Sequence, residues 1–216
     1  MRKLIVLFVV IVIITGLYFI CLFKNNKSLG DNGMYSEIGI NYKILVNYPL
    51  SGYQKLDNLI INKLNNEINE FKIRISNDNI NVNWNYHLIV NYKSFNYKNY
   101  ISYVFFIEYF VGGAHPDHLI YTVNYDTFSN RFVTINDLVK YNNNILNIFS
   151  KVSRDVLMYN KDIVDISMMM EGTMPNINNY GNFVFSNNGI IIYFSYYQVA
   201  PYSSGMFEVL INYNYL

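Results

Sequence analysis

Cysteine is almost absent from this sequence, because Cys21 is the single cysteine among 216 residues. A disulfide framework is therefore excluded, and the fold must be held by packing alone. Charged residues are also sparse, at 14%, and no basic block is available to follow a phosphate backbone. We expect no nucleic-acid partner. Disorder is excluded as well, because 52% of the residues are hydrophobic.

Charge is missing altogether from residues 4–23, a run of 20 that begins with Leu4 and ends with Phe23. A helix of that length, at ~1.5 Å per residue, spans about 30 Å, the thickness of a bilayer's hydrocarbon core. Arg2 and Lys3 precede the run as in a secretory signal, but the run exceeds the roughly 7–15 apolar residues of a cleaved one. The sequence therefore predicts an uncleaved transmembrane anchor in contact with the lipid bilayer.

Two other fates of this N-terminus remain open at the level of sequence. Cleavage after Ser28-Leu29-Gly30 would release a secreted domain, although Lys24 and Lys27 are an awkward context for a signal peptidase. Lipidation of Cys21 is disfavoured, because the residues before it, Tyr18-Phe19-Ile20, are bulky.

The charges that flank residues 4–23 are nearly balanced, so the positive-inside rule decides little. The commoner arrangement puts residues 1–3 in the cytoplasm as a short stub and exports the large domain on a single-pass anchor in the cell membrane. Residues 24–36 are then a tether. Of the 16 Lys and Arg, two precede the span, so residues 24–216 carry 14 against 15 Asp and Glu, a net charge of about −1.

Apolar periodicity predicts the elements of the exported part. One half-buried strand is expected from Ile38 to Tyr48, and an amphipathic helix between Ser51 and Arg74. Three antiparallel strands should follow as a meander, over residues 82–92, 101–111 and 119–125.

The remaining pattern predicts a second helical region and a closing group of strands. Thr134 has the character of an N-cap for a short helix, and a longer helical stripe runs from Ile145 to Val156. Strands are expected at 182–186, 189–197 and 207–213. Residues 161–181 have no sustained period, so we assign them no structure and expect a mobile surface.

Strands grouped between two helices indicate an α+β fold, with a mainly antiparallel sheet and two helices packed on the same sheet. It is preceded by one N-terminal transmembrane helix. We divide the exported part into an N-terminal strand–helix–strand subdomain, residues 37–100, and a C-terminal subdomain, residues 101–216.

Two groups of motifs resemble a bacterial extracytoplasmic domain family of undefined biochemical role. The first is Tyr109-Phe110-Val111-Gly112-Gly113-Ala114-His115-Pro116, followed by Tyr121-Thr122-Val123-Asn124-Tyr125 and Val133-Thr134-Ile135-Asn136-Asp137-Leu138. The second is Asn182-Phe183-Val184-Phe185, then Gly189-Ile190-Ile191-Ile192-Tyr193-Phe194 and Gln198-Val199-Ala200-Pro201-Tyr202-Ser203-Ser204-Gly205. The resemblance covers residues 109–213, and the region from Ile38 resembles the partner domain found upstream in the same proteins.

This family includes RsiV-type anti-sigma factors, whose outer domain binds lysozyme, and the non-catalytic region of PdaC-type peptidoglycan deacetylases. The resemblance therefore implies a role at the cell envelope. Three residues precede the span, so we expect no cytoplasmic segment that could hold a sigma factor, and no deacetylase domain follows Leu216. Neither activity transfers whole.

Candidate chemistry is sparse. His115, Asp117 and His118 are the densest set of metal-ligand types, but a glycine turn with backbone-bonding polar residues explains them as well, and we expect no metal and no cofactor. His87 is expected to be solvated. Ser203 and Ser204 lack a nucleophile motif, and the acidic residues Glu108, Asp126, Glu171 and Glu208 are scattered, so we expect no enzyme and no catalytic residue.

The leading hypothesis is therefore a membrane-anchored extracytoplasmic binding module. It would recognise an envelope protein, such as a lysozyme-like hydrolase, or a cell-wall glycan. The alternatives are an assembly partner of another membrane protein and, less favoured, a wall-modifying enzyme. The residues chosen as partner-binding candidates lie in the two motif groups: Gly112, Gly113, His115, Tyr197, Pro201, Tyr202 and Gly205.

Overall fold

A computed structural model describes residues 29, 33–77 and 85–216 of the chain. The expected anchor at residues 4–23, and the start of the strand expected at 82–92, lie outside these residues. Among the described residues, no helix is both long enough and apolar enough to cross a bilayer.

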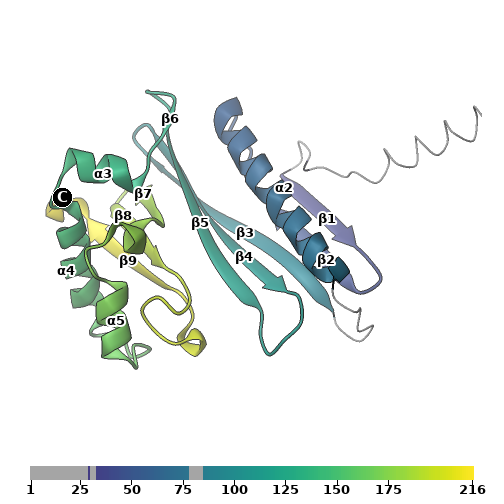
Figure 1. Ribbon diagram of the computed structural model, residues 1–216. Helices are drawn as coiled ribbons and strands as arrows, with labels where there is room; N and C mark the ends of the chain where they lie inside the picture. The colour runs from purple at the N-terminus through teal and green to yellow at the C-terminus, as the bar shows by residue number, and fades with distance from the viewer. Residues whose placement is uncertain (1–28, 30–32, 78–84) are drawn as a thin grey trace, which may run out of the picture.

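The first half of the described chain forms a six-stranded sheet with one long helix (Figure 1). The strands lie in sequence order, and all neighbours are antiparallel except β2 and β3, which the helix connects. This confirms the mainly antiparallel α+β architecture and the meander. The elements are β1 (Met34–Ile38), β2 (Tyr42–Asn47), α2 (Gln54–Asn77), β3 (Tyr86–Tyr97), β4 (Tyr100–Phe110), β5 (Asp117–Asp126) and β6 (Arg131–Phe132).

Helix α2 covers one face of this sheet with the apolar stripe that the sequence predicts. Its buried residues recur every three or four positions, and they pack against the buried side chains of β2 and β3. Each such side chain stabilises the fold by roughly 1.5–3 kcal/mol. The stripe consists of Leu56, Ile60, Leu64, Ile68 and Phe71.

The single strand expected from Ile38 to Tyr48 is wrong, because the chain reverses within it. Ile38 and Ile40 belong to the alternation but lie at a turn, where they are 76% and 101% exposed. The amide of Gly39 donates to the carbonyl oxygen of Tyr42 at 2.9 Å and closes a hairpin. Strand β1 begins at Met34, so the range expected to be a tether, 24–36, overlaps the sheet.

The second half of the chain forms a three-stranded antiparallel sheet in the order β7–β8–β9. These strands confirm the closing group, and helices α3 and α4 confirm the helical region at 134–156. The elements are α3 (Ile135–Tyr141), α4 (Ile145–Leu157), α5 (Ile166–Gly172), β7 (Phe183–Ser186), β8 (Gly189–Phe194) and β9 (Phe207–Asn212), with short 3-10 turns η1 (Ile177–Tyr180), η2 (Tyr202–Ser204) and η3 (Tyr213–Tyr215).

The two long helices do not pack on one sheet. Helix α4 buries Ile145, Phe149 and Leu157 against the second sheet, in a core separate from that of α2. The layers are therefore α2, first sheet, second sheet, and the α3–α5 group (Figure 1). Residues 86–97 and 100–110 form one hairpin, so the expected boundary at residue 100 lies inside a hairpin of the first sheet.

Strand β4 is buried on both faces, which is why two sheets can pack on each other. Tyr103 and Phe105 face α2, whereas Val104 contacts Val184 and Tyr193 of the second sheet.

Buried side chains also substitute for strand pairing at the edge of β7. Asn124 donates to the carbonyl oxygen of Phe183 at 2.9 Å. Ser102 donates to the Asn124 side-chain oxygen at 2.6 Å and accepts from the amide of Phe185 at 3.2 Å. These bonds join the two sheets and satisfy polar groups that burial would otherwise penalise.

The expectation of an unstructured, mobile 161–181 segment is wrong. It contains α5 and η1, and Met169, Thr173 and Tyr180 are fully buried. The Tyr180 hydroxyl donates to the carbonyl oxygen of Thr173 at 2.8 Å. The segment lacks periodicity because single side chains, not a continuous face, fix it in the core.

Candidate binding site

All three histidines of the chain lie at one end of the first sheet. His87 is on β3 and His118 is on β5, and Glu108 on the intervening strand β4 is paired in register with His118. His115 lies in the loop that connects β4 to β5. The antiparallel register therefore gathers residues that are up to 31 positions apart along the chain.

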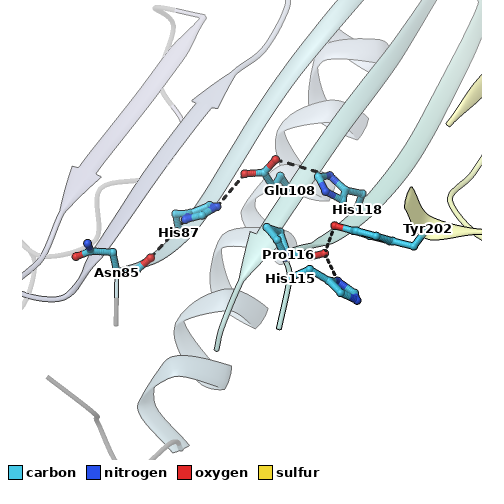
Figure 2. Close-up of polar contacts among 7 residues, drawn as sticks. All are labelled: Asn85, His87, Glu108, His115, Pro116, His118 and Tyr202. Atoms are coloured by element: carbon cyan, nitrogen blue, oxygen red, sulfur yellow. Dashed lines mark hydrogen bonds and ion pairs between the residues drawn. The ribbon is translucent and has the colours of Figure 1, made fainter. Parts of the chain in front are cut away.

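Glu108 bridges two of these histidines (Figure 2). One of its oxygens lies 2.8 Å from His87 Nε2, and the other lies 3.7 Å from His118 Nδ1. His87 Nδ1 also makes a long, 3.4 Å contact with the carbonyl oxygen of Asn85. The His87 side chain, which we expected to be solvated, is 25% exposed and contacts Glu108.

The loop after β4 is joined to the corner between β8 and β9. The carbonyl oxygen of Pro116 accepts from the Tyr202 hydroxyl at 2.8 Å and contacts His115 Nδ1 at 3.0 Å (Figure 2). The rings of His115 and Tyr202 stack with centroids 4.0 Å apart. This contact links the two sheets at the histidine end.

Aromatic rings continue from this contact along the corner. His118 stacks on Tyr196 at 4.4 Å with an interplanar angle of 9°. The ring centroid of Tyr202 lies 5.1 Å from that of Tyr196 and 5.6 Å from that of Tyr197. We call this group, together with Glu108 and His115, the histidine–tyrosine cluster. Burial, the neighbouring Tyr196 hydroxyl and Glu108 raise the pKa of Tyr202.

Two hollows flank the stacked His118–Tyr196 pair. One, of about 280 Å³, has Glu108, Asn91 and Met206 in its lining. The other, of about 250 Å³, is lined by Asp117, Arg74, Tyr109, Tyr197 and Tyr202. Arg74, from the last turn of α2, lies over the ring of Tyr109 at 5.5 Å. Aromatic walls with a few charged and hydrogen-bonding groups are typical of small-ligand sites.

Residues of the 161–181 segment bond to the corner between β8 and β9. Gln198 donates from Nε2 to the carbonyl oxygens of Gly172 and Asn179, at 3.2 and 2.9 Å. A Cβ on Gly172 would lie 1.9 Å from the Gln198 carbonyl oxygen, so only glycine allows this approach. Ser204 donates to the carbonyl oxygen of Asp162 at 2.8 Å, a structural use of its hydroxyl.

The structure brings together most of the residues chosen from the sequence. His115, Tyr197 and Tyr202 belong to the cluster, and Pro201 and Gly205 flank η2 in the same corner. Gly112 and Gly113 have φ of 99° and 109°, so they set the conformation of the loop.

The binding residues chosen from the sequence leave out three members of the site: Arg74, Glu108, and His118 as a stacking partner. Pairing Glu108 with His118 across two strands could have been found from the strand register alone. The described residues contain no group of three His, Cys, Asp or Glu side chains placed to hold a metal ion.

Comparison with known families matches residues 136–214 to the family described as "Protein of unknown function (DUF3298)". The chain is also 31% identical, over 165 residues, to peptidoglycan-N-acetylmuramic acid deacetylase PdaC of Bacillus subtilis (strain 168). That match covers 75% of this chain and 35% of the deacetylase, so the chain spans about a third of its relative's length. Residues 136–214 therefore match the DUF3298 family, and the chain is homologous to part of PdaC.

Two crystal structures of DUF3298 family proteins share the fold. The protein from Pseudomonas aeruginosa PAO1 has a TM-score of 0.62 and 14% identity, with 85% of this chain and 90% of the other covered. The protein from Bacteroides fragilis has a TM-score of 0.56 and 17% identity, with coverage of 84% and 88%. These likenesses establish the DUF3298 fold for nearly all of the described chain and leave its ligand open.

Proposed function

We propose that this protein is a membrane-anchored, extracytoplasmic and non-enzymatic module that binds cell-wall glycan through the histidine–tyrosine cluster. The observation that carries the proposal is the homology to a protein whose name says that it acts on peptidoglycan. Only the class of ligand is carried over, because the chain spans about a third of that relative. The anchor is residues 4–23, an uncharged run long enough to cross a bilayer.

The geometry of the cluster supports a polysaccharide ligand. Sugar rings have apolar faces that pack on aromatic side chains and hydroxyl rims that need donors and acceptors. Tyr196 and Tyr202 supply the aromatic faces, while Glu108, Asp117 and Arg74 supply carboxylate and guanidinium groups in the two hollows. Because the hollows adjoin the same His118–Tyr196 stack, they suit two consecutive units of one glycan strand.

Charge does not favour a lysozyme-like hydrolase over glycan as the partner. The net charge of about −1 over residues 24–216 gives little long-range attraction for a cationic enzyme. A protein partner, including one in a membrane assembly, is therefore the alternative that the experiment must distinguish.

Co-sedimentation with insoluble peptidoglycan tests the proposal. The full chain in lipid nanodiscs is mixed with purified sacculi, and separately with immobilised lysozyme, and the retained fraction is measured. We expect retention by sacculi, with about tenfold weaker binding for Tyr196→Ala, since removal of a central aromatic anchor costs about 1–2 kcal/mol.

Tyr159→Ala is the matched control, because Tyr159 is 88% exposed and belongs to neither hollow. It should bind as the unaltered chain does. Retention by lysozyme alone, or equal retention of Tyr196→Ala and Tyr159→Ala by sacculi, would overturn the glycan proposal.

A further inference from the structure

A third cavity, of about 430 Å³, lies at the opposite end of the strands from the histidine–tyrosine cluster. Its lining includes Tyr100 at the start of β4, whereas Glu108 of the cluster is eight residues further along the same strand. At about 3.4 Å per residue, the two sites are separated by roughly 27 Å. A ligand here would not touch the cluster.

Stacked aromatic pairs form the walls of this cavity and join the two sheets. Tyr97 stacks on Tyr213 with centroids 4.5 Å apart, and Tyr100 stacks on Phe185 at 4.3 Å. Leu138 of α3 is among the apolar side chains that complete the lining. The exposed lining is mostly apolar, which suits an aromatic or aliphatic ligand body.

The charges around this cavity are mainly positive. Arg131 is paired with Asp137, with 2.9 Å between Nη1 and Oδ1. Lys98 lies over the Tyr97 ring at 5.0 Å and makes no ion pair with any residue that the structure describes. A cation beside an apolar hollow, where the Asp137 side chain is already paired with Arg131, is complementary to an anionic group on the ligand.

The backbone at Lys98 is strained, so a structural role in the turn does not by itself explain why this residue is a lysine. Lys98 has a φ of 52°, in the left-handed region that side chains other than glycine avoid. Glycine would adopt this conformation more easily, so the turn between β3 and β4 keeps a lysine where folding alone favours glycine.

We propose that this cavity binds a small amphipathic anion: a compact aromatic or aliphatic body held between the stacked rings, with its acidic group against the Lys98 ammonium. The site is independent of glycan binding, because it shares no residue with the two hollows of the cluster.

Calorimetry with two probes of one shape tests this inference. Naphthalene-2-sulfonate carries the anionic group, and naphthalene-2-sulfonamide keeps the ring system without the charge. With the full chain in nanodiscs, and protein-free nanodiscs as the blank, we expect the sulfonate to bind about fivefold more tightly than the sulfonamide, the worth of one surface charge contact.

Two variants locate the binding. Lys98→Gly should lose this fivefold preference and leave sulfonamide binding unchanged, whereas Lys161→Gly, at an exposed loop lysine, should keep it. Leu138→Trp should fill the hollow and abolish binding of both probes. No binding of either probe, or a preference for sulfonate that survives Lys98→Gly, would overturn the inference, and Lys98→Gly decides even if Leu138→Trp fails to fold.

Discussion

Tyr202 donates a hydrogen bond to the carbonyl oxygen of Pro116 at 2.8 Å, across 86 positions of the chain. This bond ties the corner of the second sheet to the loop of the first, and the His115 ring stacks on Tyr202 beside it. The candidate site is therefore a junction between the two sheets, and its shape depends on their docking.

Removing this one hydroxyl should loosen the junction without unfolding the protein. Tyr202→Phe keeps the stacked ring but removes the hydroxyl donor, so the carbonyl oxygen of Pro116 keeps only its contact with His115 Nδ1. This loss should lower the free energy of unfolding by about 1 kcal/mol. Chemical denaturation measures the loss, and hydrogen exchange should rise in the 111–118 loop. Tyr141→Phe, at a tyrosine that is 92% exposed, is the control and should change neither. Equal stability of Tyr202→Phe and the unaltered chain would contradict the junction role.

Acid should weaken the first sheet through Glu37. Burial acts to raise the pKa of this carboxyl, but hydrogen bonds from Lys72, Tyr35 and Tyr42 outweigh it and lower the pKa to about 2. The ionised form is therefore favoured by folding. Its contribution to stability is fully present above the ordinary pKa of 4.5 and is lost as pH falls from about 4.5 towards 2.

Denaturation of Glu37→Gln at a series of pH values checks this assignment. The variant should be less stable than the unaltered chain at pH 7, by about 1–2 kcal/mol, and the difference should shrink below pH 3. A stability difference between the two proteins that is constant from pH 7 to pH 2 would show that the ionised Glu37 carboxylate is not its source.

Glycine is required at one hairpin and dispensable at a nearby turn. A Cβ at Gly189 would lie 2.1 Å from the carbonyl oxygen of Ile211, whereas a Cβ at Gly181 would meet nothing within 4 Å. Gly189→Ala should therefore lower the free energy of unfolding by about 3 kcal/mol or more, because backbone must move apart. Gly181→Ala should change it by less than about 0.5 kcal/mol. Similar thermal midpoints for the two variants would refute the close approach.

Membrane attachment should depend on residues 4–23. Two lysines in the middle of the run, Val10→Lys with Ile14→Lys, should prevent stable insertion, since each costs about 3 kcal/mol at the centre of a span. Val10→Leu with Ile14→Leu is the matched control. Fractionation with alkaline extraction should recover the unaltered chain and the leucine variant in the membrane pellet. Recovery of the unaltered chain in the medium would favour cleavage after residue 30.

Local patterns could predict most elements of this fold, but they could not predict its layering. The stripe of α2 is visible because it buries one continuous face. Strand β4 is different: Ser102 and Val104 face the second sheet while Tyr103 and Phe105 face α2, and only one of these faces was interpreted from the sequence. That omission led to the expectation of one sheet.

The parts of the candidate site that lie within one segment could be predicted from the sequence. The parts that strand register brings together could not. The glycine loop at 112–113 and the corner at 201–205 stand out in the sequence because their backbone conformations need special residues. Glu108 has no local signal, since its partner His118 is reached only through strand pairing. Residues 161–181 gave no period because buried anchors such as Met169 and Tyr180 fix them singly.

Titration of a soluble peptidoglycan tetrasaccharide into the full chain tests the central claim most directly. The account predicts saturable binding by calorimetry, about tenfold weaker affinity for Tyr196→Ala, and unchanged affinity for Tyr159→Ala. No binding of the tetrasaccharide, or the same affinity in Tyr196→Ala and Tyr159→Ala, would contradict it.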